Sequence, residues 1–271
     1  MTLHDTTALT HGAAGRRWPT PRWLRAMAYW GYQYKRTWKG SLTTSFLFPV
    51  LYLTAIGKVL GWLIHHPVAG QPYLDFLAPG LLAATVMQVG AADAMYPVMG
   101  AIKWLRTYFA MLATPLDVTD VLVGHLAWIA TRLTIVTTIF LGLMAALGTV
   151  HSAMAVLALP AAVVTGMAFA APIAGFAATA QNDTPFTTIY RFGLIPLFLF
   201  SGTFFPIAVL PGWLHPVAEV TPLYHGVALC RGLVLGHLGA WQGLAHAAYL
   251  VVLMTLGVRL AMTTYRRRLV T

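Results

Sequence analysis

Two charged residues inside apolar stretches are the best-placed residues in this sequence for chemistry. Asp93 and Arg132 each fall within a run long enough to cross a bilayer. An ionised side chain there is costly unless it meets a partner or water. Asp93 is the candidate partner of Arg132. The pair has two interpretations, a structural bridge between two helices or the polar lining of a translocation path, and the sequence leaves both open.

Residue types that usually carry catalysis lack the setting they need. No GxxxxGK[ST] phosphate loop occurs, so any ATP and Mg²⁺ must be bound by a different chain. The histidines are spaced unlike a HExxH helix, and Ser201 has no GxSxG turn around it. The single cysteine, Cys230, excludes a Cys-based metal cluster. We expect no catalytic residue, no metal site and no cofactor on this chain.

The composition is that of an integral membrane protein. Hydrophobic residues make up 58% of the 271 residues and charged residues only 9%, against about 25% charged in soluble domains. A bilayer needs about 20 apolar residues per helix. We predict an all-α membrane domain over 22–271, preceded by a disordered cytosolic tail at 1–21. Its six expected spans are 42–64, 76–98, 121–147, 153–179, 192–207 and 241–262.

The basic residues indicate how this domain is oriented. Loops rich in Lys and Arg mark the cytosolic side of a membrane protein. With six spans, fourteen of the 17 Lys and Arg residues fall on one side, which places both termini in the cytosol. The net charge of +10 then reflects orientation and anionic lipid headgroups, and no nucleic-acid partner is expected. The fourteen are Arg16, Arg17, Arg22, Arg25, Lys35, Arg36, Lys39, Lys103, Arg106, Arg191, Arg259, Arg266, Arg267 and Arg268.

Residues 22–39 mix aromatic and basic side chains without a spanning apolar run. Aromatic rings prefer the headgroup layer, and cations prefer its cytosolic face. We therefore predict an interfacial helix lying on the membrane. The alternative is a solvated basic linker.

The cytosolic segment between the second and third spans combines two cations with large apolar residues. It is predicted to be helical from Lys103 to Leu112 and to stop at Thr114–Pro115. Such a helix suits docking into a partner's groove. On spacing alone, lipid binding is an equal alternative. The candidate contact residues are Lys103, Trp104, Arg106, Tyr108, Phe109, Met111 and Leu112.

The long stretch 201–236, before the last span, is apolar but broken by four prolines, Pro206, Pro211, Pro216 and Pro222. Irregular backbone at membrane depth survives only where it is buried in protein or faces a cavity. Two short helices that dip in from outside and return would satisfy this condition. Its two charges, Glu219 and Arg231, are expected either to pair or to face the outer opening. The candidate gate residues are Phe204, Phe205, Pro206, Trp213, Glu219 and Arg231.

Three stretches carry a family resemblance. The first is Tyr73 to Gly80. The second is Tyr108 to Leu116, which continues through Asp120 and Gly124 to the run 127–132. The third is Ser201 to Pro206, followed by Leu210–Pro211, Pro222–Leu223 and Arg231–Gly232. In order and spacing they resemble the membrane subunits of the type-two exporter class of ABC transporters. The resemblance is closest to the branch that exports lipo-oligosaccharide nodulation signals and to actinobacterial drug-export permeases.

The resemblance implies a permease of the bacterial plasma (inner) membrane with an N-terminal interface helix and paired re-entrant helices. Two permeases, identical or paralogous, would pair with two ATPase subunits that bind ATP and Mg²⁺. Lys103 to Leu112 would be the coupling helix, and Phe204 to Leu235 the outer gate. Relatives often carry an acidic residue just after the glycine that matches Gly124, whereas this chain has His125. An ion pair at that position is therefore in doubt.

The favoured function is the permease subunit of an ATP-driven exporter that moves an amphipathic substrate, namely a drug, a lipid or a glycolipid. Membrane lipids would surround it. One alternative is a passive channel or ion-coupled transporter, which predicts several intramembrane carboxylates, and only Asp93 qualifies. The other is an integral membrane enzyme acting on lipids, which would be active without a partner.

Overall fold

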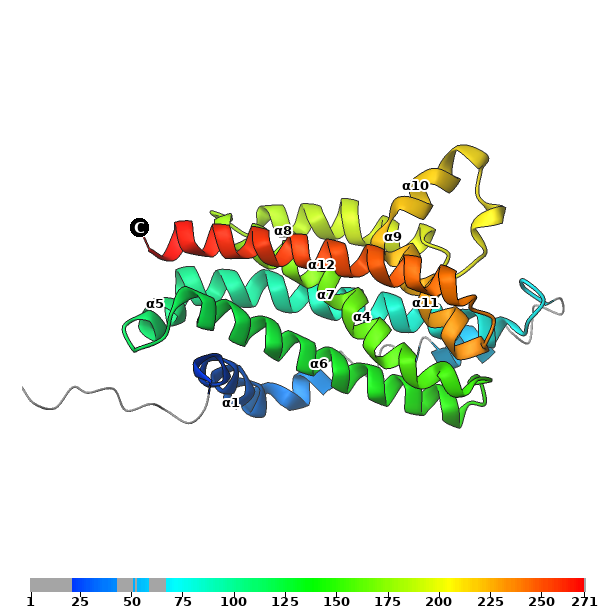
Figure 1. Ribbon diagram of the computed structural model, residues 1–271, viewed down its shortest axis with the longest axis horizontal. Helices are drawn as coiled ribbons and strands as arrows, with labels where there is room; N and C mark the ends of the chain where they lie inside the picture. The colour runs from blue at the N-terminus through cyan, green and yellow to red at the C-terminus, as the bar shows by residue number, and fades with distance from the viewer. Residues whose placement is uncertain (1–20, 43–50, 52, 59–66, 271) are drawn as a thin grey trace, which may run out of the picture.

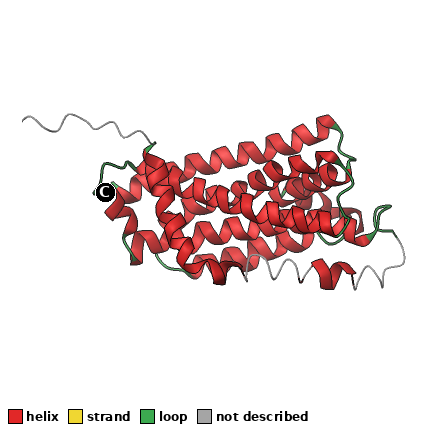
Figure 2. Cartoon of the chain, turned by 90° about the horizontal axis from the view of Figure 1, so that it is seen from below, coloured by secondary structure: helices red, strands yellow, loops and turns green. Residues whose placement is uncertain are grey.

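The computed structural model describes residues 21–42, 51, 53–58 and 67–270. Every regular element within these ranges is a helix, and the longest helices lie side by side in an elongated bundle (Figure 1). The same bundle seen after a quarter turn is again entirely helical (Figure 2). Most of the expected tail at 1–21, and most of the first expected span at 42–64, lie outside the described residues.

Within the part of the chain that the structure describes, four helices are long and apolar enough to cross a membrane. The predicted spans 76–98, 121–147, 153–179 and 241–262 are therefore confirmed as helices. The last of them continues to Leu269, where the arginine-rich end is still helical. The four are α4 (Tyr73–Met99) with its extension η4 (Gly100–Trp104), α6 (Val118–Ala146), α7 (Ala158–Thr179) preceded by η5 (Ala153–Leu157), and α12 (Ala240–Leu269).

The fifth expected span, 192–207, has the wrong boundaries. Three elements follow one another without a break: α8 (Thr184–Thr188), η6 (Ile189–Leu194) and α9 (Ile195–Phe200). The helical segment therefore starts and ends earlier than predicted. It ends at Phe200 because Gly202 takes a left-handed backbone conformation, with φ of 79°, and Pro206 follows in extended geometry.

The remaining helices are shorter and lie near the two ends of the bundle. One end carries part of α1 (Arg22–Leu42), α5 (Thr107–Leu112) and the carboxyl end of α12, and we call it the basic end (Figure 1). The opposite end carries α10 (His215–Val220) and its preceding turns, η7 (Ile207–Val209) and η8 (Gly212–Leu214). Next to these, α11 (Pro222–Leu235) packs against α4, α7 and α12. A π-helical turn, η3 (Leu53–Lys58), completes the described elements.

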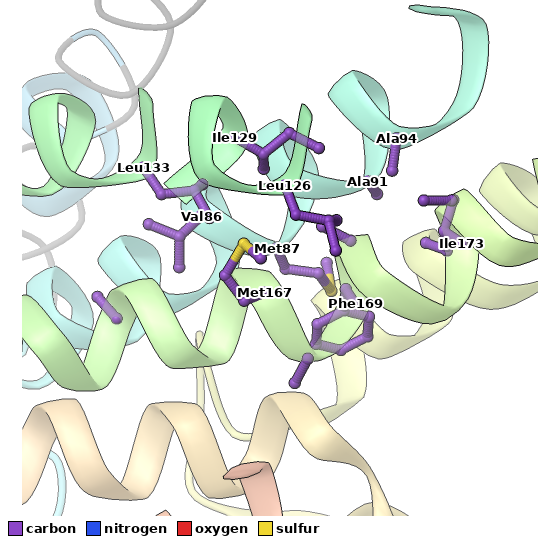
Figure 3. Close-up of a cluster of buried hydrophobic side chains, with 14 of the residues drawn as sticks. Val86, Met87, Ala91, Ala94, Leu126, Ile129, Leu133, Met167, Phe169 and Ile173 are labelled. Carbon is purple, nitrogen blue, oxygen red and sulfur yellow. The ribbon is translucent and has the colours of Figure 1, made fainter. Parts of the chain in front are cut away.

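The core lies where α4, α6 and α7 meet (Figure 3). Met87 and Ala91 of α4 face Leu126 and Ile129 of α6, with Met167 of α7 closing the cluster. All five side chains are buried. Since lipid is as apolar as this core, close van der Waals packing rather than the hydrophobic effect holds such helices together.

Small residues allow the helices to approach closely. A Cβ atom on Gly90 of α4 would lie 2.7 Å from the carbonyl oxygen of Gly166 in α7. No side chain fits there without moving one of the two backbones. The contact therefore fixes how α4 crosses α7, and with it the position of the turn that follows α4.

Candidate functional site

The turn after α4 is a wide helical turn followed by a reversal. The N–H of Leu105 donates to the carbonyl of Gly100 at 2.8 Å, which closes the π-helical turn η4. Arg106 then adopts left-handed geometry with φ of 51°, an uncommon value for a residue other than glycine. The prediction of one helix from Lys103 to Leu112 is therefore wrong. Lys103 and Trp104 end the preceding helix, and α5 begins only at Thr107.

Tyr108 anchors α5 in the bundle. Its side chain is completely buried, and a hydrogen bond joins its hydroxyl to Nδ1 of His125 in α6 at 2.7 Å. The hydroxyl of Tyr265 in α12 lies 3.5 Å from the same oxygen. Burial, and secondarily the neighbouring Tyr265, raises the pKa of Tyr108 well above its usual value, so the phenol stays neutral.

The first helix, α1, also reaches this cluster. Trp30 of α1 stacks on the His125 ring with centroids 4.2 Å apart and planes 12° apart. Four helices, α1, α5, α6 and α12, thus meet around one set of aromatic rings. The sequence left in doubt whether an ion pair forms at His125. In the structure its ring belongs instead to this hydrogen-bonded cluster of aromatic side chains.

The opposite side of the turn is open. Trp104 is 63% exposed and Leu105 is 67% exposed, and Arg106 and Phe109 are exposed beside them. We call Trp104, Leu105, Arg106 and Phe109 the exposed face of the turn. Of the predicted contact residues, Tyr108 and Met111 are buried and point away from any partner on this side. Leu105 was not among those residues, because only the left-handed turn at Arg106 brings it to the surface.

Basic residues from two parts of the chain, the turn itself and the end of α12, meet beside the exposed face. Lys103 Nζ donates to the carbonyl of Gln181, in the turn between α7 and α8. A cavity of about 390 Å³ is lined by Ile102, Lys103, Arg106, Phe109 and Arg268. The sequence gave no sign that Arg268 of α12 lies there.

The ion pair expected from the sequence forms. Arg132 of α6 donates to Oδ1 of Asp93 in α4, with both side chains mostly buried. The Arg132 guanidinium also lies 5.2 Å from the centre of the Tyr34 ring in α1. The pair thus joins α4 to α6 and contacts α1 as well.

The helix predicted at 22–39 is present as α1, and one of its sides packs on α6. Ala26 and Trp30 are buried. A Cβ atom on Gly124 of α6 would lie 2.6 Å from the Cβ of Ala26. The Arg and Lys residues of α1 described in side-chain detail, Arg22, Arg25, Lys35 and Arg36, lie on its exposed surface. Glycine at 124 is what allows α1 to lie this close to the bundle.

Arg231 of α11 has a different role from the one predicted. Its Nε donates to the Phe76 carbonyl at 3.0 Å, and its Nη2 donates to the Gly202 carbonyl at 2.9 Å. The guanidinium lies 3.8 Å from the centre of the Phe76 ring. Glu219 is exposed and makes no ion pair with Arg231. The expectation that the two pair or face an opening is therefore wrong for Arg231, because backbone carbonyls hold it inside the protein.

The other candidate gate residues differ in how exposed their side chains are. Phe204, Phe205 and Pro206 are partly buried in the turn after α9, where the Phe204 ring meets Phe198 edge-on at 4.9 Å. Trp213 is 72% exposed in η8. The structure brings the first three close to the Arg231 contacts and leaves Trp213 at the periphery.

Together these features define a polytopic helical membrane protein with a tethered, partly exposed turn at its basic end. The family model described as ABC-2 type transporter matches residues 23–235. The chain therefore belongs to the ABC-2 type transporter family.

Curated relatives agree with this assignment. Nodulation protein J of Rhizobium leguminosarum bv. viciae is 34% identical over 218 residues, which cover 79% of this chain and 83% of that protein. Nodulation protein J of Rhizobium meliloti is 30% identical over 251 residues, covering 91% and 92%. That of Bradyrhizobium diazoefficiens is 27% identical over 267 residues, covering 98% and 99%. The similarity thus extends over nearly the whole chain.

Proposed function

We propose that this chain is the permease subunit of an ATP-driven exporter in a bacterial inner membrane. A separate ABC ATPase binds the ATP and Mg²⁺ and hydrolyses the nucleotide. Membership of the ABC-2 type transporter family is the observation that carries the proposal. Similarity to proteins of rhizobia supports the bacterial location.

Six spans with both termini in the cytosol complete the proposed topology. The four long apolar helices, the helical segment Thr184–Phe200 and the expected first span at 42–64 make up the six. Basic residues at the ends of α4 and α12, together with those of α1, support a cytosolic basic end. On this orientation α10 and α11 form the re-entrant pair at the outer end, and Phe204, Phe205 and Pro206 contribute to an outer gate beside them.

The exposed face of the turn is the proposed docking site for the ATPase. Two large apolar side chains, Trp104 and Leu105, lie in the open next to Arg106 and Phe109. Apolar and aromatic anchors surrounded by charge are typical of energetically important contacts between proteins. Lys103 and Arg268 add positive charge beside them. Two such permeases would pair with two ATPase subunits.

The proposed cargo is amphipathic, namely a drug, a lipid or a glycolipid. Apolar side chains dominate the spanning helices, and the Asp93–Arg132 pair is the polar group that could orient such a molecule beside them. Movement from the inner to the outer side follows from the type of transporter that the family resemblance implies.

A reconstituted complex tests the proposal. The chain is co-expressed with an ABC ATPase from the same bacterium, and vesicles are assayed for ATP hydrolysis and for movement of a fluorescent phospholipid. Replacing both Arg106 and Phe109 by Ala should uncouple hydrolysis from movement while the permease remains folded, because both side chains are exposed. Trp213→Ala at the opposite end is the control and should have no effect. Full coupling in the double variant would remove the docking role.

A further inference from the structure

Two histidines from different helices meet close to the end of the bundle that is opposite the basic end (Figure 1). His225 lies at the start of α11, and His246 lies in α12. Their Nδ1 atoms are 2.8 Å apart while the ring centroids are 5.0 Å apart, so the two nitrogens face each other directly. The contact is a hydrogen bond in which the N–H of one ring donates to the unprotonated nitrogen of the other.

Helix α12 contacts the His225 ring a second time, through Tyr249. The two rings stack with centroids 3.9 Å apart and planes 23° apart. The Tyr249 hydroxyl donates to the carbonyl of Val220, the last residue of α10, at 2.5 Å. A single polar cluster around His225 therefore joins the start of α11 and the end of α10 to α12.

The hydrogen bond between His225 and His246 depends on how many protons the two rings carry. With both rings neutral, or with one of them protonated, one Nδ1 donates and the other accepts. When both rings are protonated, both Nδ1 atoms are donors, so the hydrogen bond is lost and two positive charges face each other. Histidine normally titrates near pH 6.5, so mild acid is the range in which this change occurs.

The surroundings provide no negative charge that would stabilise two protonated rings. Glu219 of α10 is exposed and, among the described residues, forms an ion pair with neither histidine. The acidic residues of α4, Asp75 and Asp93, are both paired with other side chains. Helix α7 and the turn η5, which also pack on α11, contain no charged residue. The charged side chain of α11 itself, Arg231, is a cation.

We infer that the His225–His246 contact is an acid-sensitive switch that holds α10 and α11 against α12 at neutral pH and releases them in mild acid. Burial, and secondarily the neighbouring His246, lowers the pKa of His225, which the backbone of Glu219 opposes in part. The folded protein therefore resists the second proton more than the unfolded chain does. The stabilisation is complete above the ordinary histidine pKa of about 6.5 and is lost as the pH falls below it. Its meaning for transport rests on the proposed function, in which α10 and α11 lie at the outer end.

Titration of the full chain in phospholipid nanodiscs, without an ATPase, tests the switch. NMR of isotope-labelled histidine follows the protonation of each ring. His225 and His246 should take up their protons in two steps, the second at a clearly lower pH than that of the exposed His237. A single joint step at the pH where His237 titrates would overturn the inference. Because no nucleotide is present, this outcome is independent of whether ATP-driven export fails or succeeds.

Amide hydrogen exchange of α11 measures the release. His246→Gln and His225→Gln each keep a side chain that can form hydrogen bonds but that stays neutral in acid. The rate in the wild type, divided by the rate in either variant at the same pH, should rise roughly 5-fold between about pH 7.5 and about pH 5.5. The division removes the intrinsic effect of pH on exchange.

His237→Gln is the matched control, since it makes the same change at an exposed histidine near the same end. The corresponding ratio for this variant should not depend on pH. A ratio that is equally constant for His246→Gln and His225→Gln would overturn the inference, because the two rings would then not control how α11 is held.

Discussion

The hydroxyl of Tyr108 and Nδ1 of His125 lie 2.7 Å apart and join the turn after α4 to the middle of the bundle. Tyr108 belongs to the short helix α5, and Phe109, the next residue, is exposed. The Tyr108 side chain itself is held between α6, α12 and α1. In the proposed complex, these contacts are what would link an ATPase bound at Phe109 to the long helices.

Tyr108→Phe should destabilise the protein by about 1–3 kcal/mol, because it leaves a buried ring nitrogen of His125 without its partner. The phenyl ring still fills the space, so packing is preserved. The free energy of unfolding in mixed micelles measures the effect. Tyr32→Phe on the exposed side of α1, where the ring is 68% exposed, should change nothing. Equal stability of the two variants would contradict the anchoring role.

Loss of one partner of the Asp93–Arg132 pair should cost about 3–5 kcal/mol, since it leaves an uncompensated charge in a largely buried position. Arg132→Leu should therefore be far more disruptive than Arg259→Leu, which removes an exposed charge from α12. A double-mutant cycle of Asp93→Ala and Arg132→Ala measures the coupling. Strictly additive effects would mean that the two side chains do not interact.

Gly90→Ala should destabilise the bundle by about 1–3 kcal/mol, because the new Cβ would meet the Gly166 carbonyl oxygen at 2.7 Å and force α4 and α7 apart. Gly142→Ala is the matched control on α6, where no atom of the described residues lies within 4 Å of the new atom. It should be neutral or stabilise by up to about 1 kcal/mol. Thermal unfolding of both variants compares them directly. A tolerated Gly90→Ala would mean that the crossing is looser than the structure indicates.

Arg231→Lys should lower stability by about 1–3 kcal/mol although the charge is retained. The planar guanidinium reaches the Phe76 and Gly202 carbonyls at the same time, which a single ammonium on a flexible stem does poorly. Arg22→Lys at an exposed position of α1 controls for the exchange itself. Unchanged unfolding of Arg231→Lys would show that the two hydrogen bonds contribute little.

Long-range features of the fold could be predicted from the sequence where a single physical requirement dominates. Apolar runs of bilayer length located α4, α6, α7 and α12 to within a few residues at most ends. A charge inside a membrane is costly unless it has a partner, and this requirement predicted the pairing of Asp93 with Arg132 that the structure shows.

Local backbone geometry could not be predicted in the same way. The left-handed conformation of Arg106 divides the expected coupling helix, and no residue type at that position signals it. The end of α9 at Phe200 depends on Gly202, whose left-handed geometry is one of several that glycine can adopt. Arg231 was expected either to pair with Glu219 or to face the outer opening. Its partners are instead backbone carbonyls, which every residue possesses and which a sequence therefore does not single out.

We propose that the exposed face of the turn after α4 contacts a separate ATPase. Photocrosslinking measures this contact, with p-benzoylphenylalanine in place of Phe109 at the basic end or of Trp213 at the opposite end, in cells that also produce an ABC ATPase of the same bacterium. A crosslink to the ATPase is expected from position 109 and none from position 213. A crosslink from position 213 alone, or none from position 109 in a complex that still co-purifies, would contradict it.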